Sequence, residues 1–339
     1  MLTKIYRNSC CVLRFILMKI MTKVIQLMNF SSITRSLSHL IRYAHPGLHS
    51  KLRRGVMQFK KQIAKPPSQL PIIPMSEGDF IPGSLNFTCN ICGINCSHLL
   101  NKISREEISC HSCGSTLRLR SLIAIFTRRL FGKNMSLDEI PVRRDLLGIG
   151  MTDWFVYAEK LAKKLSYTNT FYHCDPKLDI MNPPESMTAL LDFVITSDVL
   201  EHVVPPVSKA FENIFKILKP GGILFLTVPY TLNDSTVEHF PDLNAFKIIE
   251  GPNGFYLENT TLDGRVERFD KLCFHGGPGS TLEMRVLCEK EALKLLKDAG
   301  FIDIQIHHEA YFEHGVYQAI PWSLPISAKK PTVIEQALK

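Results

Sequence analysis

The sequence predicts an α/β fold in which helices cover both faces of a doubly wound, mostly parallel sheet. Two observations support this prediction. Residues 191–230 read as an apolar strand, an amphipathic helix and a second apolar strand with short connections, which is a βαβ unit. Upstream, residues 143–150 read as another strand that ends in glycines just before a helix, over 154–165, the arrangement that opens many doubly wound sheets.

Charge is distributed unevenly along the chain. Residues 1–76 hold 13 of the 40 Lys and Arg and no Asp or Glu, so the remainder carries 27 basic and 32 acidic residues, a net charge of −5. A mildly acidic body does not favour a nucleic-acid groove, so nucleic acid is not an expected partner. Four of the ten cysteines fall in two Cys-x-x-Cys pairs, a pattern that fits a reducing, cytoplasmic location better than a secreted disulfide scaffold.

Residues 1–80 are expected to form a basic arm and linker. The apolar stretch 12–30 is interrupted by Arg14, Lys19 and Lys23, which predicts an amphipathic basic helix rather than a membrane span. Three interpretations stay open: peripheral contact with an anionic membrane, a partner-binding or disordered arm, and a start further downstream, for example at Met57 or Met75. The acid-free, Arg- and Ser-containing composition is also compatible with an organelle transit segment.

Residues 81–132 are predicted to form a small zinc-ribbon module followed by a helix. The two Cys-x-x-Cys pairs are separated by 17 residues, a spacing that lets two tight turns aim their thiolates at one tetrahedral Zn²⁺. The expected ligands are Cys89, Cys92, Cys110 and Cys113. Four thiolates would close the site, so the zinc is expected to be structural. Cys96 and His111 rank below these four as ligands.

The segment 115–130 is predicted to be a helix capped by Ser115. Apolar residues at helical spacing are expected to face a core: Leu117, Leu119, Leu122, Ile123, Phe126 and Leu130. The arginines beside them are Arg118, Arg120, Arg128 and Arg129. They could contact an anion, but solvated arginines flanking an apolar stripe are the expected arrangement.

Residues 192–203, DFVITSDVLEHV, and 211–230, FENIFKILKPGGILFLTVPY, resemble the second half of class I S-adenosylmethionine-dependent methyltransferases. In that family, strand four ends in a loop with an acidic residue, and LKPGG leads into strand five. The resemblance implies that S-adenosylmethionine lies across the carboxyl edge of the sheet, between Gly150 and Asp198. The cysteine module, with CGS and an Arg/Leu helix, also resembles the N-terminal zinc modules of some bacterial methyltransferases.

The cofactor-binding residues expected from this resemblance lie in the first half of the sheet. Gly148 stands where the family motif has an acid, and Gly150 is its one clear glycine. Asp175 follows a second predicted strand, 168–173, and comes 25 residues after Gly150, near the offset at which an acid reaches ribose hydroxyls. Asp175 and Asp179 are both candidates for the acid that binds the ribose. Asp175 is preferred, which places Asp179 near the adenine. Asp179 stands where the family usually inserts a helix and a strand, so this half of the sheet is expected to be shortened.

The methyltransferase domain is expected to span residues 140–330, with a lid insertion over 231–280 above an acceptor pocket. Turn residues around Asp263-Gly264 predict a hairpin over 255–269. Further on, Glu283 to Val286 reads as a short strand and Glu289 to Ala299 as a helix. Residues 301–307 and 316–320 suit an antiparallel hairpin that closes such sheets.

The implied reaction is an in-line transfer of methyl from a sulfonium to a nucleophile, for which an enzyme supplies alignment and, in some cases, a base. The candidate bases are His202 after strand four, and His239 and His275 on the lid. Asp198-x-x-Glu201-His202 also has the spacing of a small oxygen/nitrogen metal site, although shared structural roles for Glu201 and His202 are commoner.

A small-molecule or glycan-type acceptor is expected. Two rival functions remain open. A catalytically inactive, zinc-containing binding protein is favoured by the incomplete glycine motif, which has only one clear glycine, Gly150. An RNA methyltransferase is disfavoured by the acidic body, although the basic arm could compensate.

Overall fold

The computed structural model describes residues 83–277 and 279–337, which belong to one compact unit, Pro82–Lys339. The predictions made for residues 1–80 therefore lie outside the described residues. Within the described part of the chain, no helix is both long and apolar enough to cross a membrane.

The centre of the fold is a six-stranded sheet in the order β15-β16-β6-β5-β3-β4. The strands are β3 Arg143–Met151, β4 Leu165–Thr170, β5 Leu191–Ser197, β6 Leu218–Thr227, β15 Ile302–Ile306 and β16 Ile326–Lys329. The first four run parallel to one another, and β16 runs antiparallel to both of its neighbours. This sheet confirms the predicted Rossmann-like α/β architecture.

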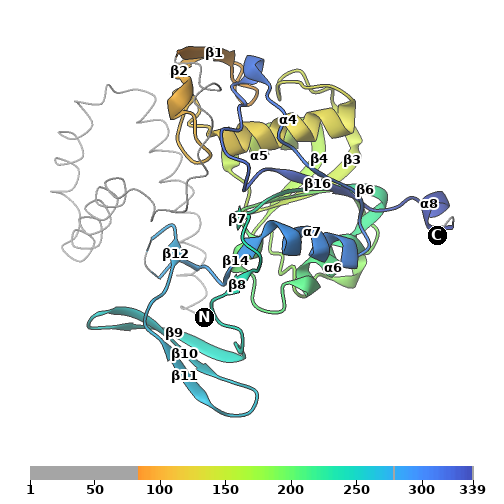
Figure 1. Cartoon of the computed structure of the whole chain (residues 1–339). Helices are drawn as coiled ribbons and strands as arrows, with labels where there is room; N and C mark the ends of the chain where they lie inside the picture. Colours follow the sequence, from red (N-terminus) through yellow and green to blue (C-terminus); the bar gives the residue numbers. More distant parts are fainter. Residues whose placement is uncertain (1–82, 278, 338–339) are drawn as a thin grey trace, which may run out of the picture. The chain divides into compact units, whose positions relative to one another are not determined.

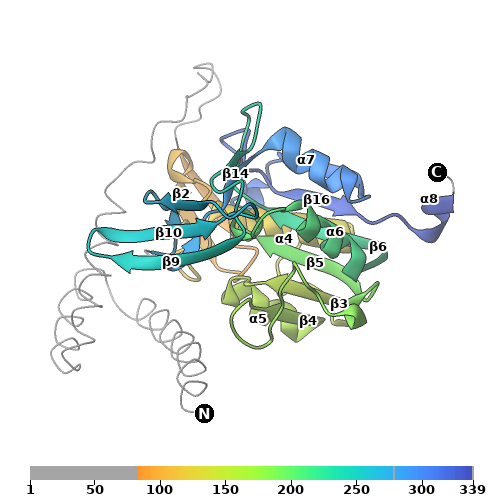
Figure 2. The ribbon, with the colours of Figure 1, turned by 90° about the horizontal axis from the view of Figure 1, so that it is seen from below.

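Helices cover both faces of the sheet (Figure 1). They are α4 Leu117–Phe131 and α5 Phe155–Lys164 on one face, and α6 Ser208–Ile217 and α7 Glu289–Asp298 on the other. Figure 2 shows the same layers from below, with the short α8, Val333–Ala337, beyond the sheet. Side chains alternate along β5, so Phe193 and Ile195 enter the core beneath α4 and α5, whereas Val194 enters the core beneath α6.

The structure corrects two strands of the predicted sheet. The second strand begins and ends three residues earlier than expected, as β4. The predicted strand over 316–320 is wrong, because the antiparallel partner of β6 is β16, at 326–329. Val316 instead pairs with Tyr311 in an isolated bridge and packs with Leu117 and Ala124 of α4. The shortened first half is confirmed, since β4 is the edge strand and only a 3₁₀ turn, Glu185–Met187, precedes β5.

The cysteine module consists of an antiparallel pair, β1 Ser84–Thr88 and β2 Asn95–Leu99, a 3₁₀ turn, Leu100–Lys102, and the start of α4. Gly93 and Gly114, which follow the two Cys-x-x-Cys pairs, both have φ +76°, the left-handed backbone that glycine accommodates best. The predicted Ser115 cap is wrong. The helix starts after Thr116, without a side-chain cap, and Ser115 is buried in the module.

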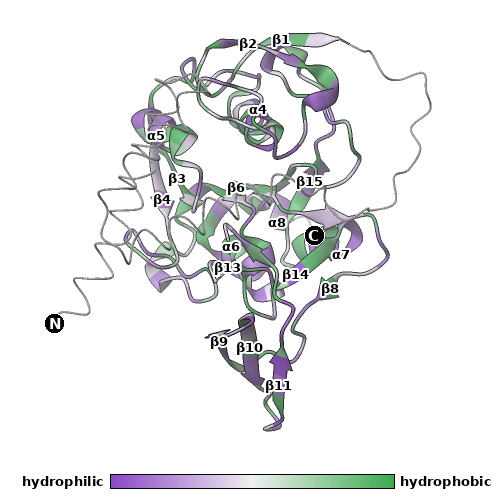
Figure 3. Ribbon diagram, turned by 90° about the vertical axis from the view of Figure 1, so that its left-hand side faces the viewer, coloured by the Kyte–Doolittle hydropathy of each residue, from purple (hydrophilic) through white to green (hydrophobic). Residues whose placement is uncertain are grey.

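The predicted lid is mostly β-structure. Its strands are β7 Tyr230–Thr231, β8 Val237–Glu238, β9 Ala245–Gly251, β10 Gly254–Thr260, β11 Val266–Phe269 and β12 Phe274–His275, followed by β13 Thr281–Leu282 and β14 Arg285–Cys288. The hairpin expected over 255–269 is confirmed as β10 and β11. Four buried residues give this segment a small core: Phe240, Leu257, Leu282 and Met284. In Figure 3, β9, β10 and β11 carry both hydrophilic and hydrophobic residues.

Candidate functional site

The carboxyl ends of β3, β4 and β5 meet at one edge of the sheet. The end of β3 aligns with both neighbours, because Met151 pairs with Thr196 of β5 and with Thr170 of β4. The turn after Gly150 and the loop at Asp198 are therefore adjacent, as the sequence predicted. The polar side chains that follow these three strands share one edge, which is where open α/β sheets bind ligands.

Asp198 is the charged centre of this edge. Its backbone adopts φ +53°, an uncommon conformation for a non-glycine residue that often marks a functional site. Arg105 donates two hydrogen bonds to its carboxylate, at 2.9 and 2.7 Å, and Thr227 Oγ1 donates a third at 3.1 Å. Burial alone would raise the pKa of Asp198, but the Arg105 and Arg118 guanidinium groups more than offset it, and the pKa is lowered. Asp198 is therefore an ionised carboxylate at neutral pH.

The arginines at this edge come from the cysteine module and its helix. Arg118 of α4 lies 3.1 Å from the Asp198 carboxylate and donates to Ser197 Oγ at 2.5 Å. Glu106 accepts from both Arg105 and Arg118. The prediction that solvated arginines flank α4 is wrong for Arg118, whose side chain is 16% exposed, and for Arg120, which is fully buried. Their partners lie far away in sequence, so helical periodicity could not reveal them.

The two predicted motif glycines are explained by packing within the protein. A Cβ on Gly148 would lie 2.3 Å from the Phe193 ring. A Cβ on Gly150 would lie 2.0 Å from both Asp153 Oδ2 and Tyr167 Oη. The space beside these glycines is therefore occupied by side chains, rather than left open as the resemblance implied.

Asp153 is a feature of this edge that sequence reasoning did not single out. It is 5% exposed, and its Oδ2 accepts a hydrogen bond from Tyr167 Oη at 2.7 Å. The Asn169 side chain holds the adjoining turn, because it accepts a hydrogen bond from the Asp153 backbone amide and donates one to the Asp153 carbonyl. Burial raises the pKa of Asp153 to about 7. The signal available in the sequence was its position, three residues after Gly150 at the start of a helix.

The two predicted nucleoside acids lie after β4 in different settings. Asp175 is exposed, so its carboxylate is accessible to a ligand. Asp179 accepts hydrogen bonds from the Met181 amide and the Asn182 side chain, at 3.0 and 3.1 Å, which is a local turn arrangement. Asp175 is the better placed of the two to bind hydroxyl groups.

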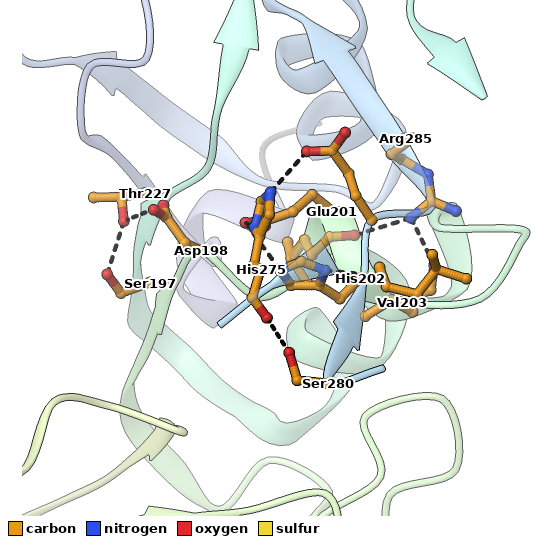
Figure 4. A network of polar contacts seen from close by, with 12 residues as sticks. Ser197, Asp198, Glu201, His202, Val203, Thr227, His275, Ser280 and Arg285 are labelled. Atoms are coloured by element: carbon orange, nitrogen blue, oxygen red, sulfur yellow. Dashed lines mark hydrogen bonds and ion pairs between the residues drawn. The ribbon is translucent and has the colours of Figure 1, made fainter. Parts of the chain in front are cut away.

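The structure brings together the three predicted histidines, which are far apart in sequence. His239 Nε2 and His275 Nε2 lie 2.9 and 3.0 Å from the two carboxylate oxygens of Glu283. The rings of His202 and His275 form an edge-to-face pair with centroids 4.6 Å apart. Figure 4 shows His202 and His275 beside the Asp198 loop. Glu283, which links two of the histidines, was not predicted as a site residue.

The turn that carries His202 is fixed by the buried Arg285 of β14. This 3₁₀ turn spans Leu200–His202. Arg285 donates hydrogen bonds to the Val203 carbonyl at 2.6 Å (Figure 4) and to the Leu200 carbonyl at 2.9 Å. It also pairs with Glu238 at 2.6 Å. The Met284 amide donates to the Glu201 carbonyl at 2.8 Å. The Arg285 side chain of β14 and the Met284 amide just before this strand therefore set the position of Glu201 and His202.

The electrostatics of this cluster differ from residue to residue. Burial raises the pKa of Glu201, whose carboxylate is fully buried, to about 8. Burial also lowers the pKa of His202, which favours the neutral ring. The hydrogen bond with Glu283 raises the pKa of His275. The neutral His202 ring is thus suited to accept a proton or bind a cation, whereas His275 gains basicity from its carboxylate partner.

The four predicted cysteine ligands converge on one point, with all sulfur atoms within 4.8 Å of one another. Sulfur separations are 3.7 Å for Cys89–Cys113, 3.6 Å for Cys92–Cys110 and 3.5 Å for Cys110–Cys113. A tetrahedral zinc with bonds of about 2.3 Å would place its sulfurs about 3.8 Å apart. Cys96 lies 3.4 Å from Cys110 but outside the group of four.

A buried positive charge adjoins this cysteine cluster. Arg120 donates to Ser115 Oγ at 3.2 Å, and the same hydroxyl lies 3.3 Å from Cys89 Sγ. The other Arg120 partners are neutral oxygens of Ser109, Ser115, His314 and Gly315. Four thiolates around one Zn²⁺ carry a net charge of −2, so the guanidinium would offset part of it.

Residues 151–273 match the Methyltransferase domain family. This stretch begins at the end of β3, includes the Asp198 loop and most of the lid, and contains the segment 192–230 on which the resemblance was based. A comparison with curated proteins finds no match.

Several solved methyltransferase structures match part of the chain. One S-adenosylmethionine-dependent methyltransferase from Clostridium acetobutylicum is 14% identical, with 62% of this chain and 97% of that chain covered and a TM-score of 0.33. The amino pentose methyltransferase CalS10 from Micromonospora echinaspora is 11% identical, with coverages of 64% and 92% and a TM-score of 0.35. Phosphoethanolamine N-methyltransferase 2 from Haemonchus contortus is 13% identical, with 55% of this chain and 38% of that chain covered and a TM-score of 0.30. At these scores the likenesses carry no argument about substrate.

Proposed function

We propose that the protein is an S-adenosylmethionine-dependent methyltransferase that acts on a small-molecule or glycan-type acceptor in the cytoplasm. The observation that carries this proposal is the match of residues 151–273 to the Methyltransferase domain family. The sheet order supports it, since β3, β4 and β5 present their carboxyl ends together. In this proposal residues 140–330 form the catalytic domain, with a lid over 231–280, and residues 81–132 form the zinc module.

The chemistry of the edge suits the cofactor. S-adenosylmethionine supplies an activated methyl group on a sulfonium, together with an ammonium, a carboxylate and two ribose hydroxyls. Asp198 would bind the ammonium, and the guanidinium groups of Arg105 and Arg118 would bind the carboxylate. The exposed Asp175 would accept the ribose hydroxyls. Gly148 and Gly150 would contribute through close packing of the strands beneath.

The histidine cluster would form the acceptor side of the site. If His239 donates its Nε2 hydrogen to Glu283, its Nδ1 keeps a lone pair that can take a proton from the acceptor. His202 and His275 lie on the same cluster, and His275 is bonded to the same carboxylate. Glu283 thus orients two of the three candidate bases.

Cofactor binding is the direct test of the proposal. We expect calorimetry to show micromolar binding of S-adenosylhomocysteine to the full chain, and we expect Asp198→Asn to weaken it about 10- to 100-fold, because a charged hydrogen-bond partner is lost. Asp192→Asn is the matched control. Asp192 lies at the other end of β5, where it pairs with Lys219 at 2.9 Å, so its replacement should leave affinity unchanged. No binding to wild-type protein that circular dichroism shows to be folded would refute the proposal.

A second test addresses the base. Single replacements of His202, His239 and His275 by Gln are expected to include at least one that slows methyl transfer about 10²- to 10⁴-fold, the usual contribution of a general base. The measurement is the S-adenosylhomocysteine formed with a panel of hydroxylated small molecules and glycans. Wild-type rates in all three variants would show that none of these histidines acts as the base. Catalysis would then rest on the alignment of the cofactor with the acceptor.

One observation favours the rival function, a methyltransferase-like binding protein without activity. Asp153 and Tyr167 fill the space beside Gly150, where the family places the cofactor against a bare backbone. The same calorimetry separates the two functions, since the rival predicts no binding of either S-adenosylmethionine or S-adenosylhomocysteine.

A further inference from the structure

The carboxylate of Glu201 is buried without a hydrogen-bond partner. Its side chain is 0% exposed, and neither Oε1 nor Oε2 has a hydrogen-bond partner within the part of the chain that the structure describes. An unpaired buried carboxylate is costly, and such groups are normally hydrogen-bonded, paired or bound to a metal. The position of Glu201 is nevertheless held firmly by Arg285 and by the Met284 amide, so the unpaired carboxylate requires an explanation.

Two imidazole nitrogens face this carboxylate at distances too long for hydrogen bonds. His202 Nε2 lies 3.5 Å and His275 Nδ1 lies 3.9 Å from Glu201 Oε1. These ligand atoms of Glu201, His202 and His275 all lie within 4.8 Å of one another. Two ligands bound to one ion at about 2.0–2.2 Å with tetrahedral angles are about 3.3–3.6 Å apart. The two separations from Glu201 Oε1 are close to this value, and all three ligand atoms lie near enough for a modest closure to bring them around one ion.

Each histidine uses its other ring nitrogen to contact a neighbouring oxygen. His202 Nδ1 lies 2.8 Å from the Leu282 carbonyl, which can only accept, so this nitrogen carries the hydrogen. His275 Nε2 lies 3.0 Å from Glu283. With both hydrogens donated outward, His202 Nε2 and His275 Nδ1 direct their lone pairs toward Glu201. Metal-binding histidines are oriented by carbonyl and carboxylate partners in this same way.

From this arrangement we propose that Glu201, His202 and His275 bind a divalent transition-metal ion, separate from the cysteine cluster. Two imidazoles and one carboxylate form a ligand set typical of zinc or ferrous iron sites that keep open positions. Asp198 is not among the ligands, because it does not belong to the group whose ligand atoms lie within 4.8 Å of one another. The neighbouring group of Cys273, His275 and Glu283 ranks lower, because Cys273 is exposed and Glu283 already pairs with two histidines.

The consequence is a Lewis-acid position at the base of the lid. The lid supplies His275, whereas Glu201 and His202 come from the turn after β5, so the ion would tie the lid to the sheet edge. The open positions would take water or an oxygen of a ligand. Metal binding here does not depend on the proposed methyl transfer, and the two proposals can fail separately.

Zinc stoichiometry of the full chain tests the inference. We expect two zinc equivalents in wild-type protein at saturating zinc, and one in each of Glu201→Gln, His202→Gln and His275→Gln, measured by mass spectrometry of the metal after desalting. His239→Gln is the matched control. His239 contacts Glu283 but belongs to neither metal group, so this variant should keep both equivalents.

Glu201→Gln gives a second, independent readout. Because Gln has no carboxyl group whose burial or protonation costs stability, Glu201→Gln with one zinc at the cysteine cluster should melt at a higher temperature than wild type with one zinc. A second zinc equivalent should then raise the melting temperature of wild type only. A single zinc equivalent in wild-type protein, or two equivalents in all three triad variants, would overturn the inference. In the second case the additional zinc would be adventitious.

Discussion

Removal of the zinc that we propose for the cysteine cluster is expected to abolish cooperative folding of the chain. We expect Cys113→Ser, or treatment of the wild type with a strong chelator, to cause this loss. Binding to a structural zinc site contributes about 10–16 kcal/mol of folding free energy at neutral pH. The net stability of a typical domain is only about 5–15 kcal/mol. The loss should therefore exceed what the rest of the core can offset.

The effect should reach the sheet because the cluster and the sheet share one core. Cys89, Cys110 and Cys113 belong to the same buried group as Phe126 of α4 and Phe193 of β5. Arg120 adds to the effect, since a buried guanidinium beside a dispersed cysteine cluster would lose the negative charge that offsets it. Metal loss is thus expected to affect the candidate active site as well as the module.

Cys96→Ser provides the control for this experiment. Cys96 contacts Cys110 at 3.4 Å but lies outside the group of four, so the variant should keep its zinc and its thermal transition. The measurements are zinc content and unfolding followed by circular dichroism. A Cys113→Ser protein with a wild-type transition would show that thiols alone hold the module, and the structural zinc would be refuted.

The sheet was predictable from the sequence because its strands are marked locally. The apolar runs of β5 and β6, the amphipathic α6 between them and the Lys219-to-Gly222 break specify a βαβ unit without distant contacts. The antiparallel strand β16 was misplaced because two short segments had strand-like composition. The choice between them depended on whether Val316 packed against α4 or entered the sheet, and local patterns contain no such information.

The candidate site was predictable only in part, for the same reason. His202, His239 and His275 could be identified as candidates one by one from their loops. Their convergence depends on strand β14 and on Glu283, which bonds to two of them. The arginines of α4 could be seen, but their burial could not, because Asp198 and the Gly315 carbonyl meet them only after folding. Charged residues that satisfy one another across long sequence separations are where sequence patterns fail.

Asp153 is expected to make the stability of the protein strongly dependent on pH. Burial raises its pKa from 3.8 to about 7, so the folded protein binds this proton more tightly than the unfolded chain does. Stability should therefore fall as pH rises from about 4 to about 7, and stay lower above that range. A shift of about 3 pKa units corresponds to about 4 kcal/mol. Asp153→Asn cannot ionise, so at pH 8 it should be more stable than wild type by up to this amount, or about 8–16 °C in melting temperature.

The pH dependence distinguishes this cause from a simple packing effect. Asn can still accept the hydrogen bond from Tyr167, so wild type and variant should have similar stability near pH 4 and diverge as the pH approaches 7. Asp145→Asn is the control, because Asp145 lies on the same strand but is exposed, and its replacement should produce no such divergence. Thermal unfolding across this pH range measures the difference. A difference in stability between wild type and Asp153→Asn that stays constant across this pH range would mean that Asp153 is ionised in the folded protein with a cationic partner. The buried acid beside Gly150 would then be a binding group rather than part of the packing.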